Sequence, residues 1–252
     1  MPTICVAVIV KNEEKNIEAC LETAKWADEI VIVDDESTDR TIEICKKYTD
    51  KIFERKMDIE GVHRNFAYSK ATTDWVLSLD ADERITPELA KEIQETLAQE
   101  TKHAAYAIPI KAYLGDHWIQ GAGYYPARKV RLFQKGKFEY GAQRVHPPVK
   151  IDGTCGQLNG DIIHYSYDNF HDVINKMNRE TGLEADKWIQ DGRKVTGPKV
   201  VRKAISRFLK FYFQKGGIKH GIPGFMFSFL HSFYQILTLA KYWEMRRESQ
   251  GE

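Results

Sequence analysis

The sequence has few cysteines, and they are not spaced as in metal-binding or redox motifs. Four cysteines occur among 252 residues, and none forms a CxxC pair. Cys5, Cys20 and Cys45 lie in apolar stretches, which favours buried free thiols over disulfides or zinc ligands. Cys155 is the fourth. We therefore expect a protein of a reducing compartment, the cytoplasm.

A large net charge is also absent, but the charge is unevenly distributed. The formal net charge is +1, with 42% hydrophobic and 29% charged residues, which excludes an extended disordered chain. From Arg193 onward there are 12 Lys or Arg and 3 Asp or Glu, a balance of +9 that leaves −8 for residues 1–192. A basic tail on an acidic body predicts a surface for the phosphates of a membrane or of a nucleic acid.

The first hundred residues alternate short apolar runs with helix-like patterns. Buried strands are predicted at 4–10, 29–33, 51–54 and 75–79. Helices are predicted at 12–24, from 37, at 63–70 and from 86. The first run lacks the charged leader and cleavage site of a signal peptide. The alternation predicts an α/β fold with a mostly parallel sheet flanked by helices.

The second half of the chain has a different character. Strands at 104–114 and 129–133 predict an antiparallel or mixed extension of the sheet, and the chain from Asn169 onward is expected to be mainly helical. Residues 221–240 contain no Asp, Glu, Lys or Arg, a length that can span a bilayer. Their polar residues recur at helical spacing as Ser228, His231, Ser232, Gln235 and Thr238. The residues opposite this stripe are Phe227, Phe229, Leu230, Phe233 and Leu237.

A polar stripe with basic flanks predicts that this segment lies in a membrane interface. The alternatives are a helix that spans the membrane, and a helix that packs on the protein's own core or on a second copy of the chain.

Acidic clusters follow three predicted strands, at 11–14, 34–36 and 80–83. In an open parallel sheet the carboxyl ends of the strands meet at one edge, where ligands bind. Acids there can also cap the next helix, and we interpret Ser37, Thr38 and Asp39 as such caps. Three converging clusters raise one another's pKa values unless a cation binds. Asp80 and Asp82 offer the hard oxygen ligands that suit Mg²⁺ or Mn²⁺, ions that can neutralise a departing diphosphate.

Four short motifs run from Val8 to Glu14, Ile32 to Thr41, Arg64 to Ala67 and Leu79 to Glu83. In this order and spacing they resemble the family 2 glycosyltransferases with the GT-A fold. Two later stretches, 131–133 and 163–167, are similar to the short bacterial enzymes that add β-linked glucose to the lipopolysaccharide inner core. The resemblance implies a GT-A (Rossmann-like) catalytic domain over 1–168. The helical, basic and aromatic extension over 169–252 is expected to associate with a membrane.

The resemblance also implies a UDP-sugar donor, Mn²⁺ or Mg²⁺, and a role for each matching residue. Contacts with the nucleotide sugar are implied for Glu13, Asp34, Asp35, Arg64, Asp80 and Arg131. The metal would be bound by Asp80, Asp82 and His164, with Asp82 as the principal and catalytic ligand. A histidine that is only hydrogen-bonded in the core is the alternative for His164. Arg128 and Arg131 would lie near the diphosphate, unless they are solvated surface residues.

The general base is not indicated by the family pattern. The family implies inverting transfer, in which a carboxylate deprotonates the acceptor hydroxyl. Relatives tend to have Tyr-Pro-Asp and Val-His-Glu where this chain ends the motifs with Ala127 and Pro147. Two expected acids are therefore missing. Glu139 is the nearest remaining carboxylate and our candidate base, followed by Asp161.

Two other functions fit parts of the sequence. Phosphotransferases of the haloacid dehalogenase type also place Asp-x-Asp after an apolar strand, but a Thr or Val usually stands where this chain has Arg84. A nucleic-acid-binding module would use the basic and aromatic segment 193–219, a pattern that serves an anionic membrane equally well.

We expect instead a hexosyltransferase with no nucleic-acid partner, located at the inner face of the cell membrane. It would transfer a hexose, glucose by the subfamily likeness, from a UDP-sugar to a saccharide or lipid-linked acceptor such as lipopolysaccharide core.

Overall fold

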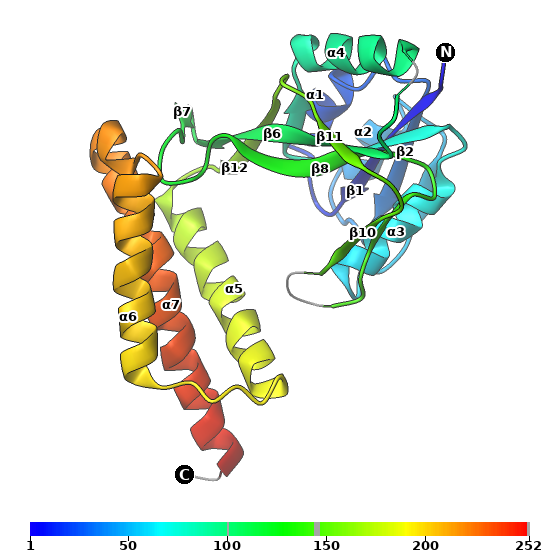
Figure 1. Ribbon diagram of the computed structural model, residues 1–252. Coiled ribbons are helices and arrows are strands. Elements are labelled where there is room, and N and C mark those ends of the chain that lie inside the picture. Colours follow the sequence, from blue (N-terminus) through cyan, green and yellow to red (C-terminus); the bar gives the residue numbers. More distant parts are fainter. Residues whose placement is uncertain (100, 144–146, 251–252) are drawn as a thin grey trace. The chain divides into compact units, whose positions relative to one another are not determined.

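The computed structural model describes residues 1–99, 101–143 and 147–250. The chain divides into two compact units (Figure 1). The first consists of Met1–Lys111 and Ala127–His164, and the second of Ala112–Pro126 and Tyr165–Glu252. The second unit thus contains an earlier segment in addition to the C-terminal extension. The predicted domain boundary after residue 168 stays a prediction.

The main sheet is mixed and has the strand order β3-β2-β1-β4-β8-β6-β12-β5. Its parallel part consists of β1 (Ile4–Val10), β2 (Glu29–Asp34), β3 (Ile52–Glu54) and β4 (Trp75–Asp80). The other strands on this path are β5 (Glu83–Ile85), β6 (Ala105–Leu114), β8 (Ala127–Gln134) and β12 (Ile162–Tyr167). Strand β8 is antiparallel to both β4 and β6, which confirms the predicted mixed extension.

Four short strands complete the β-structure. Strands β7 (His117–Trp118) and β11 (Cys155–Gln157) both pair with β6. Strands β9 (Phe138–Tyr140) and β10 (Val149–Ile151) form a separate antiparallel pair.

Helices cover both faces of the parallel strands, because side chains of a strand alternate between its two faces. The first face of β1, with Val6 and Val8, packs against α1 (Ile17–Glu22), α2 (Thr41–Cys45) and α4 (Pro87–Ala98). The other face, with Cys5 and Ala7, packs against α3 (Glu60–Lys70) and against Phe138 of β9. Cys5, Cys20 and Cys45 are free and buried, as predicted.

The start of α2 differs from the prediction. The helix begins at Thr41. Asp39 contacts its first turn, because Asp39 Oδ1 accepts from the Thr41 amide at 3.0 Å, but the interpretation as caps is wrong for Ser37 and Thr38. All three residues bind the loop after β1. Ser37 Oγ accepts from the Asn12 amide at 2.9 Å, the Thr38 amide donates to Asn12 Oδ1 at 2.7 Å, and Asp39 Oδ2 accepts from the Glu14 amide at 3.1 Å.

The cause lies in the loop after β1. Asn12 has a φ of +53°, and α1 begins only at Ile17. The backbone amides of Asn12 and Glu14 are therefore outside the helix, and they donate to the Ser37 and Asp39 side chains that could otherwise cap α2. The two loops at the edge of the sheet are therefore fastened to each other.

The second unit is built mainly from helices, as predicted from Asn169 onward. They are α5 (Phe170–Gln190), α6 (Gly197–Leu209), the π-helical turn η1 (Lys210–Gln214), the 3₁₀ turn η2 (Gly217–His220) and α7 (Gly221–Gln250). Asn169 Oδ1 caps α5 by accepting from the Asp172 amide at 3.1 Å. Helix α7 packs against both α5 and α6. Across the described residues, no helix is both long and apolar enough to cross a membrane.

The polar stripe of α7 faces inward, opposite to our expectation. Ser228 and Thr238 are fully buried, whereas Phe225 and Phe229 are 48% and 51% exposed. The hydroxyls are satisfied locally, because Ser228 donates to the carbonyl four residues before it, and Thr238 does the same, each at 2.7 Å. Ser232 donates across to the Ala204 carbonyl of α6 at 2.8 Å. Small polar side chains thus form much of the packed side of the helix. They share it with Phe227, which we expected opposite the stripe but which is 1% exposed.

Candidate active site

The acids that follow β2 are buried and already hydrogen-bonded. Asp34 accepts from the Ser37 amide at 3.1 Å. Asp35 accepts from Lys11 Nζ at 2.8 Å and from the Met57 amide at 2.7 Å. Burial by itself raises the pKa of Asp35, but the hydrogen bonds from Lys11 and Met57 outweigh burial and lower it. Asp35 is therefore held ionised at the edge of the sheet where β1 and β2 end.

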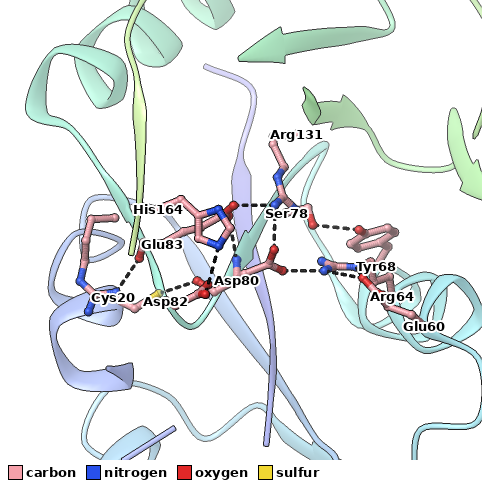
Figure 2. Close-up of polar contacts among 11 residues, drawn as sticks. Cys20, Glu60, Arg64, Tyr68, Ser78, Asp80, Asp82, Glu83, Arg131 and His164 are labelled. Atoms are coloured by element: carbon pink, nitrogen blue, oxygen red, sulfur yellow. Dashed lines mark hydrogen bonds and ion pairs between the residues drawn. The ribbon is translucent and has the colours of Figure 1, made fainter. Parts of the chain in front are cut away.

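The end of β4 carries an ionic cluster centred on Asp80 (Figure 2). Arg64 on α3 places its Nη2 2.7 Å from Asp80 Oδ1, and Arg131 on β8 donates from Nη2 to Asp80 Oδ2 at 2.8 Å. The same Arg131 atom donates to Glu83 Oε1 at 2.6 Å, and Glu83 Oε2 accepts from the Asp80 amide at 3.0 Å. Glu60 Oε1 accepts from Arg64 Nε at 2.9 Å and lies 2.9 Å from the Arg64 Nη2 that contacts Asp80. We call Arg64, Asp80, Glu83 and Arg131 the Asp80 cluster.

The pKa values of the two acids in this cluster are shifted in opposite directions. Desolvation raises the pKa of Asp80, but the charges of Arg131 and Arg64 outweigh it and hold the pKa well below its usual value. For Glu83, which is fully buried, desolvation dominates and raises the pKa, with a further increase from Asp80. Arg131 is only 3% exposed, so the alternative of a solvated surface residue is wrong for it.

The repulsion predicted among the acidic clusters is therefore relieved in part by the protein's own cations. Lys11 neutralises Asp35, and Arg64 and Arg131 neutralise Asp80. The prediction that repulsion among the acids requires a metal ion is therefore wrong for Asp35 and Asp80.

Asp82 lies in a different environment from Asp80, although one residue separates them. Its side chain is 29% exposed, and its Oδ2 is 3.0 Å from Nε2 of His164 on β12. The antiparallel pairing of His164 with Glu83 brings the imidazole to this position. The pKa of Glu13, after β1, is raised mainly by burial and also by the charge of Asp82. The ends of β1 and β4 thus meet as the topology predicts.

A divalent cation fits this edge of the sheet only if a bound substrate supplies part of its coordination shell. Among the residues described, no three or more His, Cys, Asp or Glu side chains are grouped to hold a metal ion. Asp82 and His164 supply a carboxylate and an imidazole. Buried Asp80 Oδ1 has no hydrogen bond of good geometry, despite the nearby Arg64. Mg²⁺ characteristically binds through one or two carboxylates plus substrate phosphates. The metal roles of Asp80, Asp82 and His164 stay predictions.

The two candidate bases lie on other elements than Asp82, Glu139 on β9 and Asp161 just before β12. Glu139 lies on β9 between Phe138 and Tyr140, whose rings pack into the core, so strand alternation turns its exposed side chain to the other face. Asp161 forms an ion pair with Lys111 at 2.6 Å. It precedes His164 by three extended residues, a separation of about 10 Å. The assignment of the base stays a prediction.

Two other sequence motifs have simpler outcomes. Arg128 Nη1 donates to the Leu158 carbonyl, so the structure shows a backbone contact for it. Val145 and His146, part of the motif that ends at Pro147, lie outside the described residues.

Glu83 is the functional-site residue whose importance the sequence did not reveal. In the sequence it is only the last residue of an acidic motif. It is buried against Arg131 of β8, which lies 48 positions away. The available signal was the basic residue Arg131 within the apolar stretch that continues as Leu132 and Phe133. A charge inside a buried strand implies a buried partner of opposite sign.

Comparisons with known proteins identify the family of the chain. The glycosyl transferase family 2 model matches residues 5–155. An uncharacterised glycosyltransferase of Rickettsia typhi is 31% identical over 100% of this chain and 90% of its own length. The lipopolysaccharide core biosynthesis glycosyltransferase LpsC of Rhizobium meliloti is 29% identical over 94% of this chain and 90% of its own.

Solved structures share the fold at low sequence identity. The mannosyltransferase PcManGT of Pyrobaculum calidifontis has a TM-score of 0.56 and 14% identity, over 96% of this chain and 87% of that one. TarS 1–349 of S. aureus, in complex with UDP, has a TM-score of 0.50 and 14% identity, over 99% and 92%. The sheet order, the acidic strand ends and these matches lead to one conclusion: the chain belongs to glycosyl transferase family 2 and has the GT-A fold.

Proposed function

We propose that this protein is an inverting, metal-dependent hexosyltransferase that transfers glucose from UDP-glucose to a saccharide or lipid-linked acceptor such as lipopolysaccharide core. The observation that carries the proposal is the Asp80 cluster with the Asp82–His164 pair beside it. The name of LpsC supports an acceptor of the lipopolysaccharide core. Family membership decides against the haloacid dehalogenase alternative.

Support for the donor comes from proteins of the same fold. TarS 1–349 is described in complex with UDP, and a glucosyl-3-phosphoglycerate synthase of Mycobacterium tuberculosis with Mn²⁺, UDP and its product. PcManGT is described with GDP-mannose and Mn²⁺. A nucleoside diphosphate is common to all three, and the choice of UDP-glucose for this chain rests on the subfamily likeness.

The residues at the sheet edge would have different roles, in binding the metal ion, the nucleoside and the diphosphate. Asp82 and His164 are the side chains that would hold Mn²⁺ or Mg²⁺, which supplies positive charge to the leaving diphosphate. Glu13, Asp34 and Asp35 offer acceptors to the hydroxyl and imide donors of ribose and base. Asp80 fixes Arg64 and Arg131 in place, so that the guanidinium groups lie ready beside the diphosphate without a large change of conformation.

Inversion needs a carboxylate within hydrogen-bond reach of the acceptor hydroxyl. Glu139 is the proposed base, with Asp161 as the second candidate. We further propose that the enzyme acts peripherally at the inner face of the cell membrane, where a lipid-linked acceptor is found.

The test is calorimetric titration of the protein with UDP-glucose, UDP-GlcNAc and GDP-mannose, each with Mn²⁺ and with EDTA. We expect Mn²⁺-dependent binding of UDP-glucose that is lost or weakened at least about tenfold in Asp82→Asn, an isosteric change that removes one ligand charge. Asp152→Asn is the matched control, because Asp152 is 69% exposed and pairs only with a surface lysine in the described structure. If neither EDTA nor Asp82→Asn weakens the binding of UDP-glucose, the metal assignment is contradicted. If no nucleotide sugar binds at all, the proposed function is contradicted.

A further inference from the structure

Exposed apolar side chains are concentrated in the second unit. Among the described residues, the large exposed hydrophobic side chains outside it are Met1, Met57 and Val149. Within it, Val201, Ile205, Leu209 and Phe213 follow one another at four-residue spacing along α6 and η1, and are 46%, 57%, 47% and 54% exposed. They form one stripe along the helix, because residues four apart lie on the same side. An open groove of about 810 Å³ runs along this stripe.

A second apolar stripe lies on α7. Ile222, Phe225, Phe229 and Phe233 are 75%, 48%, 51% and 38% exposed. The three phenyl rings stack in sequence, with centroids 6.5 and 5.9 Å apart. Tyr212 joins the two stripes, since its ring lies 5.9 Å from that of Phe225 and 5.0 Å from that of Phe213. We call these two stripes together the apolar face.

Helix α7 contains polar residues that could face the solvent, so a shortage of them does not explain the apolar face. The helix buries Ser228, Gln235 and Thr238 and exposes Phe225, Phe229 and Phe233. A helix that faces water shows the reverse arrangement. Contiguous exposed apolar surface of this kind marks a site of contact with another molecule or with a membrane.

The charge around the apolar face identifies the occupant. No acidic residue occurs in the sequence between Asp191 and Glu244. Exposed cations lie on α6 and on the turns between α6 and α7, and they are Lys199, Arg202, Lys203, Lys210, Lys215 and Lys219. Two copies of the chain that met through this face would bring like charges together, which disfavours a dimer. An anionic bilayer instead offers phosphates to the cations and hydrocarbon to the rings.

We propose that the apolar face docks on the surface of an anionic phospholipid bilayer. The side chains of Ile205, Leu209, Phe213, Phe225 and Phe229 enter the boundary between headgroups and acyl chains, and the flanking lysines and arginines bind lipid phosphates. Docking uses neither donor nor acceptor, so it stands or falls independently of the proposed transfer reaction.

Point substitutions test this surface better than truncation. Removal of residues 200–252 would delete α7, against which α5 packs, and would unfold the unit along with the surface. The full-length protein is therefore floated with vesicles of phosphatidylcholine alone and of phosphatidylcholine mixed with phosphatidylglycerol. We expect binding to the mixed vesicles only, and a decrease as NaCl is raised, because salt screens the cation–phosphate attraction.

The first variant combines Phe225→Ser and Phe229→Ser. About half of each side chain is already in water, so the fold should survive, and the loss of about half a buried phenylalanine at each site predicts about 10- to 30-fold weaker vesicle binding. Val149→Ser, a change at a 43% exposed residue of the first unit, should bind as the wild type does.

The second variant combines Lys203→Glu, Lys210→Glu and Lys215→Glu. A cation near an anionic surface contributes about fivefold to binding, so loss of three cations should weaken binding at least about a hundredfold. Its control reverses Lys91, Lys102 and Lys135, which are exposed in the first unit, and should retain binding.

Wild-type protein that fails to float with anionic vesicles, or phenylalanine variants that float unchanged, would overturn the proposal. Sedimentation velocity gives the other decisive result. A dimer without lipid that is abolished by Phe225→Ser and Phe229→Ser, in protein that does not bind vesicles, would show that a second copy occupies the face.

Discussion

Replacement of Arg131 by methionine is the most direct test of how the site is held together. Methionine keeps much of the unbranched apolar stem but removes the guanidinium that bridges Asp80 and Glu83. Both carboxylates then lose their shared cation, and Glu83 is fully buried. Removal of one partner from a buried ion pair costs about 3–5 kcal/mol, because the other charge is left uncompensated. We expect Arg131→Met to lower the free energy of unfolding by that amount.

Two companion variants separate charge from volume. Arg131→Lys keeps one positive charge on a shorter stem, so it should be less destabilising than Arg131→Met. Glu83→Gln in the Arg131→Met background removes one of the two stranded charges, and should recover part of the lost stability. Recovery stays incomplete because Asp80 still has only Arg64. The coupling between the two positions is the quantity of interest, and a double-mutant cycle measures it.

The assay is thermal and urea unfolding at pH 7, followed by circular dichroism. A loss of 3–5 kcal/mol in a chain of this size lowers Tm by about 10 °C. Arg40→Met is the matched control, since Arg40 is 70% exposed and pairs only with Glu43 among the described residues, and its loss should cost less than about 0.5 kcal/mol. A free energy of unfolding for Arg131→Met within about 0.5 kcal/mol of the wild type would refute the stabilising role of the buried ion cluster. The same holds if Glu83→Gln restores no stability in the Arg131→Met background.

Two further predictions concern the second unit. Burial lowers the pKa of His231 to about 4, so the unfolded state binds more protons below pH 6.5, and stability should fall as the pH drops from 6.5 to 4. His231→Gln should remove up to about 3 kcal/mol of that pH dependence in urea unfolding, whereas the exposed His171→Gln should leave the slope unchanged. A Cβ at Gly224 would lie 2.0 Å from the Gly217 carbonyl oxygen, so Gly224→Ala should cost about 1–3 kcal/mol by thermal unfolding. Gly197→Ala meets nothing within 4 Å and should be neutral or stabilising; equal effects of the two changes would contradict the close approach of η2 and α7.

The fold of the first unit could be predicted because its signals are local. Apolar runs of four to seven residues that alternate with helical patterns define buried strands and covering helices, and β1, β2 and β4 lie where the pattern places them. Thr86 followed by Pro87 predicted the start of α4, and the Thr86 hydroxyl does accept from the Leu89 amide at 3.2 Å. The start of α2 was missed because Ser37 and Thr38, two of its expected caps, bind Asn12, which lies 25 and 26 residues away and gives no local signal.

The sequence predicted which acidic residues come together at the site, but not which basic residues form ion pairs with them. The acids at the ends of β1, β2 and β4 were expected to converge, and the topology brings them together. Which cation each would find depends on α3 and β8, and the sequence does not specify which side chains of these two elements point at Asp80. Burial decides the rest. It makes Arg131 a core residue and raises the pKa of Glu83, and a short acidic motif carries no information about burial.

The same limit explains the error in α7 and shows what a helical pattern can establish. Periodicity separates two sides of a helix, and it did so correctly for Ser228 and Thr238 against Phe229 and Phe233. It does not say which side faces the protein. That choice depends on how closely two helices can approach, and the small hydroxyl residues of α7 allow contact with α6, where Ser232 reaches the Ala204 carbonyl. The hydroxyls lose nothing by burial because backbone carbonyls accept from them. With these residues on the packed side, Phe225, Phe229 and Phe233 lie on the outer side, where the lipid surface that we propose would remove them from water.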